Sequence, residues 1–146
     1  MGSRRRARER ALQVLCLLDV QPDLEPSAAL ELYYQHLYGD EERDEVLSEE
    51  GRRFTAQLVS GVRQDLTTLD ELIAHSSRNW RLERMNWVDR NLLRLAAWEL
   101  RSLPETPAKV VLNEAIEMAK RYGTTDSSAF VNGVLDRLLS ELGRRV

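Results

Sequence analysis

Residues 111–137 read VLNEAIEMAKRYGTTDSSAFVNGVLDR and predict two amphipathic helices joined by a tight turn. Apolar residues recur at helical spacing on both sides of the turn. They are Leu112, Ala115, Ile116 and Ala119 before it, and Val131, Val134, Leu135, Leu138 and Leu142 after it. We expect Gly123 to end the first helix and Asp126 to cap the second. The polar residues gather at this turn, where free backbone N–H groups are also expected.

The same periodicity continues toward the N-terminus and predicts an all-α chain of about seven helices. The expected ranges are 4–20, 27–38, 48–63, 67–76 and 86–102. Thr106 is the expected N-cap of the sixth helix, and Pro107 is its expected first residue. Ser48 and Asn86 are the expected N-caps of the third and fifth helices, and the acidic residues 40–45 are expected to form a loop. We expect two packed helical subdomains within one domain, approximately residues 1–78 and 79–146.

Composition agrees with a helical protein that has a real core. Of the 146 residues 42% are apolar, and only four are proline and seven glycine. No run approaches the 18 consecutive apolar residues that a membrane-spanning helix needs. The single cysteine, Cys16, excludes an internal disulfide and fits a reducing compartment. We therefore expect a cytoplasmic protein that has no membrane-spanning segment.

Charge is distributed unevenly along the chain, although the formal net charge is only −3. Residues 1–10 have a balance of +4, from five arginines and one glutamate. Residues 19–50 have a balance of −10, and residues 51–146 a balance of +3. This separation predicts a small basic patch at the N-terminus and an acidic region elsewhere.

The basic N-terminus has the sequence RRRARER over residues 4–10. On a helix, Arg4, Arg5 and Arg8 fall within an arc of about 100°. Arg4 and Arg8 continue the apolar side of the first helix, so we expect them to project beyond the end of the core. Such a segment suits an arm that grips phosphates, but a disordered basic tail or a segment attracted to acidic lipid remains open.

Phe130 and Asp126 are candidates for contacts with a base. Phe130 lies about 100° from the centre of the apolar face of its helix, so its ring can pack sideways or stack on an unstacked base. Asp126 repels phosphates, but its carboxylate can accept a hydrogen bond from a base amino group as well as cap the helix. Ser127 and Asn132 are weaker candidates.

The sequence has no recognisable catalytic, metal or cofactor motif. Glu114 and Glu117 precede Lys120 and Arg121 on one helix, so ion pairing explains them better than catalysis. The two histidines have no partners at metal-ligand spacing. We expect Cys16 to be a core thiol and the three tryptophans to be packing residues. The chain is therefore predicted to be a non-enzymatic protein without metal or cofactor.

NEAIE at 113–117 and FVNGVLD at 130–136, together with the arginines of residues 4–10, resemble the NusB family of bacterial transcription antitermination factors. The resemblance implies an all-helical fold and binding to boxA, a single-stranded RNA element, together with the small-subunit ribosomal protein NusE. It also implies action on the transcription elongation complex of RNA polymerase, chiefly during ribosomal RNA synthesis. The RNA-binding residues that it implies are Arg4, Arg5, Arg6, Arg8, Asp126, Ser127, Phe130 and Asn132.

Two other functions are kept open, and one position departs from the family. The chain could be a homo-oligomeric helical module, for example a homodimer that covers its arginines. It could also be a stand-alone relative of the RNA-binding domain of ribosomal RNA methyltransferases, although we expect no catalytic domain after Val146. Some family members have an aromatic residue about where Cys16 falls, so the resemblance does not extend base stacking to the first helix.

Overall fold

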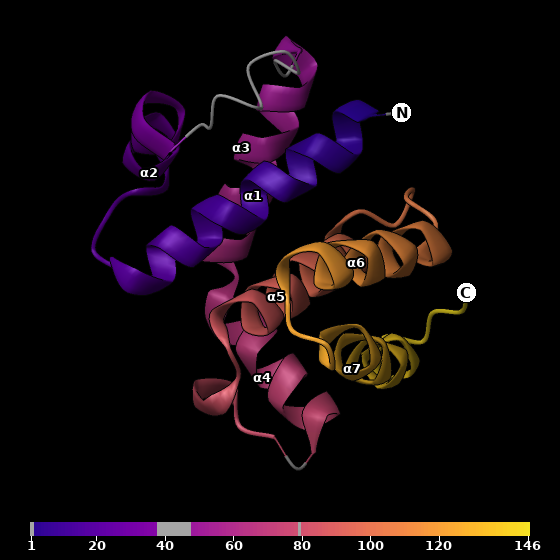
Figure 1. The fold of residues 1–146 in the computed structure, drawn as a ribbon. Coiled ribbons are helices and arrows are strands. Elements are labelled where there is room, and N and C mark those ends of the chain that lie inside the picture. Colours follow the sequence, from indigo (N-terminus) through magenta and orange to yellow (C-terminus); the bar gives the residue numbers. More distant parts are fainter. Residues whose placement is uncertain (1, 38–47, 79) are drawn as a thin grey trace. The chain divides into compact units, whose positions relative to one another are not determined.

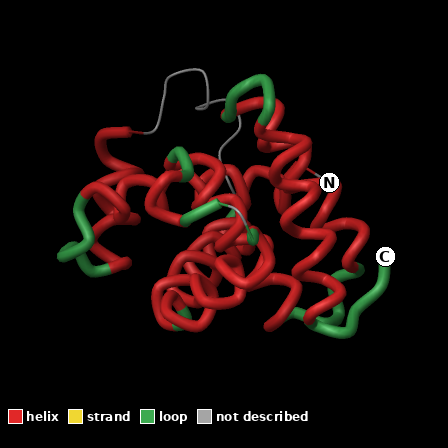
Figure 2. Tube along the Cα trace, turned by 90° about the horizontal axis from the view of Figure 1, so that it is seen from below, coloured by secondary structure: helices red, strands yellow, loops and turns green. Residues whose placement is uncertain are grey.

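The structure, a computed structural model, describes residues 2–37, 48–78 and 80–146. These residues form seven α-helices and short helical turns, with no strand in the described ranges (Figures 1 and 2). The prediction of an all-α fold with about seven helices is confirmed. The chain divides into two compact units, Met1–Arg63 and Gln64–Val146.

The first unit contains α1 (Gly2–Val20), α2 (Pro26–Leu32) and α3 (Glu49–Gln64). A π-helical turn, Tyr33–Leu37, follows α2. Proline stands at the first position of α2, where its missing N–H is not needed. The predicted acidic loop at 40–45 lies outside the described residues.

Side-chain hydrogen bonds join the helices of this unit. The Thr55 hydroxyl of α3 donates to the Ala7 carbonyl of α1 at 3.1 Å. The Tyr33 hydroxyl donates to Gln13 Oε1 at 2.6 Å, which ties the π-helical turn to α1. Both bonds satisfy polar groups on surfaces that are otherwise apolar, so they set how these helices pack.

The second unit contains α4 (Leu66–Ser77), α5 (Trp87–Ser102), α6 (Ala108–Tyr122) and α7 (Ser127–Glu141), with a 3₁₀ turn at Leu82–Arg84. Helix α5 packs against α4, α6 and α7 (Figure 1). Every residue from 91 to 100 is buried. The division between units falls before α4, earlier than the expected position near residue 78, because α4 packs against α5 and α7.

Helix starts follow the predicted capping residues at two positions. Ser48 Oγ accepts from the Gly51 N–H at 3.0 Å before α3, and Asn86 Oδ1 accepts from the Asp89 N–H at 2.8 Å before α5. Both predicted N-caps are confirmed. Helix α6 starts one residue later than expected, with Pro107 itself at the N-cap position and no capping bond from a side chain.

A charged pair is buried between α4 and α5. Arg94 donates from Nε to Asp70 Oδ1 at 2.8 Å and from Nη2 to Asp70 Oδ2 at 3.0 Å. Arg94 Nη1 also donates to Asn91 Oδ1 at 3.2 Å. The bidentate geometry compensates for taking the guanidinium out of water, so the fold of this unit depends on both partners.

We expect Asp70→Ala to lower the free energy of unfolding by roughly 2–4 kcal/mol, because it leaves the buried Arg94 charge without its carboxylate. The Asp70 side chain is 31% exposed, so the loss should be smaller than for a fully buried pair. Urea denaturation measures it. The control is Asp136→Ala, an exposed acid on α7, which should change stability by less than about 0.5 kcal/mol. Equal losses in the two variants would contradict the role of the pair.

Candidate nucleic-acid interface

The first candidate surface is the start of α1, in the first unit. The Arg4 guanidinium lies 4.0 Å from the centre of the Phe54 ring, and that of Arg8 lies 5.5 Å from it. Arg8 is only 4% exposed. The expectation that Arg4 and Arg8 both project beyond the core is therefore wrong for Arg8. The aromatic face of Phe54, on α3, attracts both cations and draws them against the unit.

The other arginines of this segment differ in exposure. Arg5 is exposed, as is Arg4, whereas Arg6 is half-buried. Arg10, which we did not include among the RNA-binding candidates, is completely buried. Of the four arginines predicted to bind RNA, Arg4 and Arg5 are therefore the two that present most surface to solvent.

The second candidate surface is the turn between α6 and α7, in the second unit. Ser127 is 1% exposed, and its Oγ accepts from the Thr124 N–H at 2.9 Å. Asp126 occupies the N-cap position of α7 but makes no capping bond with its side chain. The predicted N-cap position is confirmed, but the expected capping hydrogen bond from the Asp126 carboxylate is absent, and Ser127 Oγ makes the hydrogen bond of the turn instead. Burial of Ser127 makes it a residue that shapes the turn.

Gly123 is required at this turn by close packing. A Cβ at this position would collide with Ser127 Oγ, and it would lie 2.6 Å from Ser127 Cβ and 2.8 Å from the Ala119 carbonyl oxygen. The glycine ends α6 as expected, but in an extended conformation with φ of −93°. Its role is to leave room for the buried serine, not to adopt a left-handed conformation.

Phe130 lies on the first turns of α7 and is half-buried, as expected for the rim of the apolar face. Its ring meets the indole of Trp80 edge to face, with centroids 5.5 Å apart and an angle of 71° between the planes. Trp80 is 56% exposed, and Trp87 is 53% exposed. The expectation of core and rim packing is confirmed for Trp98, which is buried and whose Nε1 donates to Asp65 Oδ2, and for Trp80, which packs at the rim against Phe130. Asn132 is exposed on α7.

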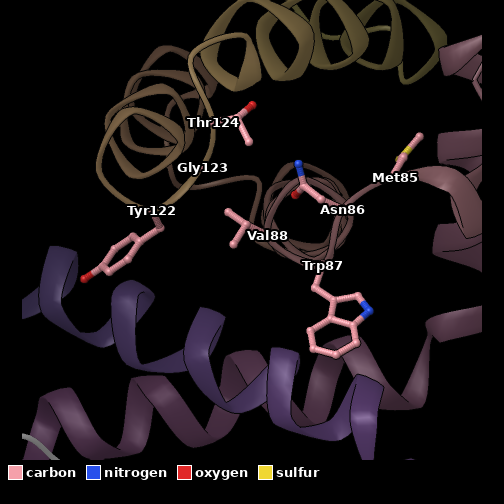
Figure 3. A pocket seen from close by; sticks show the side chains of 7 residues that line it. All are labelled: Met85, Asn86, Trp87, Val88, Tyr122, Gly123 and Thr124. Carbon is pink, nitrogen blue, oxygen red and sulfur yellow. The ribbon is translucent and has the colours of Figure 1, made fainter.

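Two neighbouring cavities open beside the α6–α7 turn and share Met85, Asn86 and Thr124. The cavity in Figure 3 has a volume of about 470 Å³ and lies between the start of α5 and the end of α6. Asn86 and Val88 point toward the turn, whereas the Trp87 indole points away from it (Figure 3). The second cavity has a volume of about 460 Å³ and includes Asp126, Phe130 and Trp80 in its lining.

The described residues were searched for membrane-spanning helices and for groups of metal-binding side chains. None of their helices is both long and apolar enough to cross a bilayer. No group of three or more His, Cys, Asp or Glu side chains in the described ranges could hold a metal ion. One of the expected ion pairs on α6 is present, with Lys120 Nζ 3.5 Å from Glu117 Oε2.

Comparison with known proteins identifies the family. The model of the NusB family matches residues 5–140. The chain belongs to the NusB family. A protein of Sorangium cellulosum called transcription antitermination protein NusB is 47% identical over 144 residues, which cover 99% of this chain and 96% of that protein. A protein of the same name from Anaeromyxobacter dehalogenans is 48% identical, with 97% and 94% coverage.

Solved NusB structures have the same fold. NusB of T. maritima is 36% identical, with a TM-score of 0.81 over 94% of this chain and 91% of that one. A structure described as antitermination factors NusB and NusE in complex with dsRNA contains a chain with a TM-score of 0.81. It is 23% identical and covers 97% of this chain and 98% of that one, so it supports the fold alone.

In this NusB-family chain, several side chains of the cavity beside Phe130 were not predicted as site residues from the sequence. Trp80, Arg84 and Asp89 line it together with Asp126 and Phe130. Trp80 and Arg84 stand between predicted helices, and Asp89 lies in the first turn of the helix predicted to start at Asn86. The sequence feature that could have indicated these site residues is the aromatic and basic composition of this connection, which reads NWRLER at 79–84.

We expect Gly123→Ala to destabilise the protein by roughly 1–3 kcal/mol, because its Cβ overlaps Ser127 and the α6 backbone. The matched control is Gly133→Ala on α7, whose Cβ would have no neighbour within 4 Å. That variant should gain about 0.5–1 kcal/mol, since glycine weakens a helix interior. Thermal and urea unfolding compare the two, and a Gly123→Ala protein as stable as Gly133→Ala would show that the turn can accommodate the methyl group.

Proposed function

We propose that this protein is an RNA-binding transcription antitermination factor without enzymatic activity. It binds boxA-like single-stranded RNA together with NusE in the bacterial cytoplasm. The complex modifies elongating RNA polymerase, chiefly during ribosomal RNA transcription. The observation that supports this most strongly is similarity over the whole length to proteins called transcription antitermination protein NusB.

The two candidate surfaces suit different parts of an RNA strand. Arg4 and Arg5 are exposed cations that can approach phosphates, which supplies affinity without regard to sequence. Phe130 and the exposed Asp126 lie by a turn in the other unit and suit unstacked bases. Ser127 positions this turn, and Asn132 offers a side-chain amide on the exposed side of α7.

Arg8 has a different role in this proposal. Arg8 is 4% exposed and its guanidinium lies 5.5 Å from the centre of the Phe54 ring, so its charge adds positive potential at the surface without contacting a phosphate. Arg6 is half-buried, so its exposure is intermediate between that of Arg8 and that of Arg4 and Arg5. The exposed arginines are therefore the ones whose removal tests the RNA contact with least effect on the fold.

The decisive experiment is a titration of fluorescently labelled boxA RNA, with and without NusE. If both partners bind the same state of the protein, NusE should increase RNA affinity by about 5- to 150-fold, as is typical of linked sites. RNA must then increase the affinity for NusE by the same factor. Independent binding would refute a cooperative adaptor. A protein that forms homodimers and binds no RNA would support the helical-module alternative instead.

Arg5→Ala should weaken binding to boxA RNA and reduce the slope of log affinity against log salt by roughly 0.7, the value for one lost phosphate contact on a single strand. The matched control is Arg145→Ala, which removes an exposed arginine near the C-terminus. Anisotropy titrations at several salt concentrations measure both slopes. A slope that changes equally in the two variants would indicate a general effect of net charge and contradict a contact at Arg5.

A further inference from the structure

Phe54 is a core residue of α3 whose ring faces arginines at the start of α1. It is 6% exposed. The guanidinium carbon of Arg4 lies 4.0 Å from the ring centre, and that of Arg8 lies 5.5 Å from it. Helices α1 and α3 lie against each other at this point (Figure 1), where the Thr55 hydroxyl donates to the Ala7 carbonyl. The packing of the first unit therefore fixes where the ring stands relative to the start of α1.

Arg4 combines this ring contact with an exposed side chain. At 4.0 Å the guanidinium is within the distance at which a cation is attracted to the face of an aromatic ring. The N–H donors of a guanidinium lie in its plane and point outward from its edges. A contact through the flat face therefore leaves these donors able to bind a phosphate, including with two parallel hydrogen bonds.

The ring also opposes forces that would turn Arg4 away from this position. Arg4 and Arg8 stand one helical turn apart on α1, where like charges repel each other. Positive charge at the start of a helix is further disfavoured by the helix dipole. Because both guanidinium groups lie against the same Phe54 ring, the attraction of each to its electrons offsets this repulsion.

An arginine that is already held in place loses less freedom when a ligand binds. A long, flexible side chain that must be immobilised on binding weakens the affinity by about 2- to 12-fold. Phe54 restricts Arg4 before RNA arrives, so part of this loss has already occurred in the free protein. A buried residue can therefore strengthen RNA binding without contacting the RNA.

We propose that Phe54 is a positioning residue for RNA binding, whose ring holds the Arg4 guanidinium in place for a phosphate. The proposal rests on the RNA-binding function proposed above and adds to it a residue in the core of the first unit. The alternative is that Phe54 only fills the core and that the arginines only cover its ring. The two alternatives differ in what the loss of the ring does to RNA affinity.

The first test is a titration of labelled boxA RNA with Phe54→Leu at several salt concentrations. The variant keeps every cation, so the slope of log affinity against log salt should be unchanged. Its affinity should be about 2- to 12-fold lower than that of the wild type at each salt concentration. Arg4→Ala should instead reduce the slope by roughly 0.7, because it removes a phosphate contact on a single strand.

Conservative variants separate the ring from core packing. Phe54→Tyr keeps an aromatic face and should bind RNA as the wild type does. Leu58→Val removes a methylene group from a fully buried residue of the same helix, so it should lower the melting temperature without changing RNA affinity. Phe54→Met is a second variant without a ring, because a flexible methionine fills irregular space well if leucine packs poorly. Thermal melts report whether each variant is folded.

A double-mutant cycle measures the link between Phe54 and Arg4 directly. Arg4→Ala should cost less RNA affinity in the Phe54→Leu background than in the wild type, by about 2- to 12-fold. The control is Arg52→Ala, which removes an exposed arginine of α3 that lies 4.4 Å from the centre of the Tyr34 ring. Its effect on RNA binding should be the same in both backgrounds.

The outcomes distinguish this role from the wider function. If the wild type binds RNA, a folded Phe54→Leu or Phe54→Met protein of unchanged affinity would overturn the positioning role and leave RNA binding intact. A Phe54→Tyr protein as weak as Phe54→Leu, or additive effects of Arg4→Ala and Phe54→Leu, would overturn it as well. A wild-type protein that binds no RNA would refute the proposed function itself.

Discussion

The close approach of α6 and α7 at Gly123 is the constraint on which the second unit's candidate surface depends. The absence of a Cβ lets the buried Ser127 side chain sit against the end of α6, where its hydroxyl accepts from the Thr124 N–H. This bond closes the turn, and the Asp126 side chain makes no capping hydrogen bond. Because α7 then leaves the turn in a fixed direction, Phe130 meets Trp80, and the two rings form one corner of a cavity.

The arginines of the basic segment at residues 4–10 fall into two groups, those packed against the first unit and those exposed to solvent. Phe54 holds the guanidinium groups of Arg4 and Arg8, and Arg8 is almost fully buried. An arginine over an aromatic ring keeps its charge, so it still contributes to the electrostatic potential outside. Contacts with phosphates require exposure, which Arg4 and Arg5 retain. The number of arginines in the sequence therefore overestimates the number of possible phosphate contacts. It still predicts correctly that the electrostatic potential at this surface is positive.

Acidic residues at a proposed RNA site are physically reasonable if affinity and selectivity come from different places. Cations supply binding to any strand, because every nucleotide has a phosphate. A carboxylate such as that of the exposed Asp126 weakens that general attraction, yet it accepts hydrogen bonds only from bases with suitable donors. Selectivity in this arrangement comes from penalising bases that cannot donate.

The sequence alone was sufficient to predict the helices and the family, because helical spacing of apolar residues and local caps such as Ser48 and Asn86 are encoded within a few residues. The motifs at 113–117 and 130–136 were likewise local. What only the tertiary structure decided depends on contacts between distant segments. Phe54 draws in Arg8, α4 packs within the second unit, Ser127 Oγ closes the α6–α7 turn by accepting from the Thr124 N–H, and Trp80 meets Phe130 across 50 positions of chain. Such contacts follow from how helices pack in space. The periodic pattern of one helix shows which of its residues are buried, but it does not specify which residues of another helix they contact.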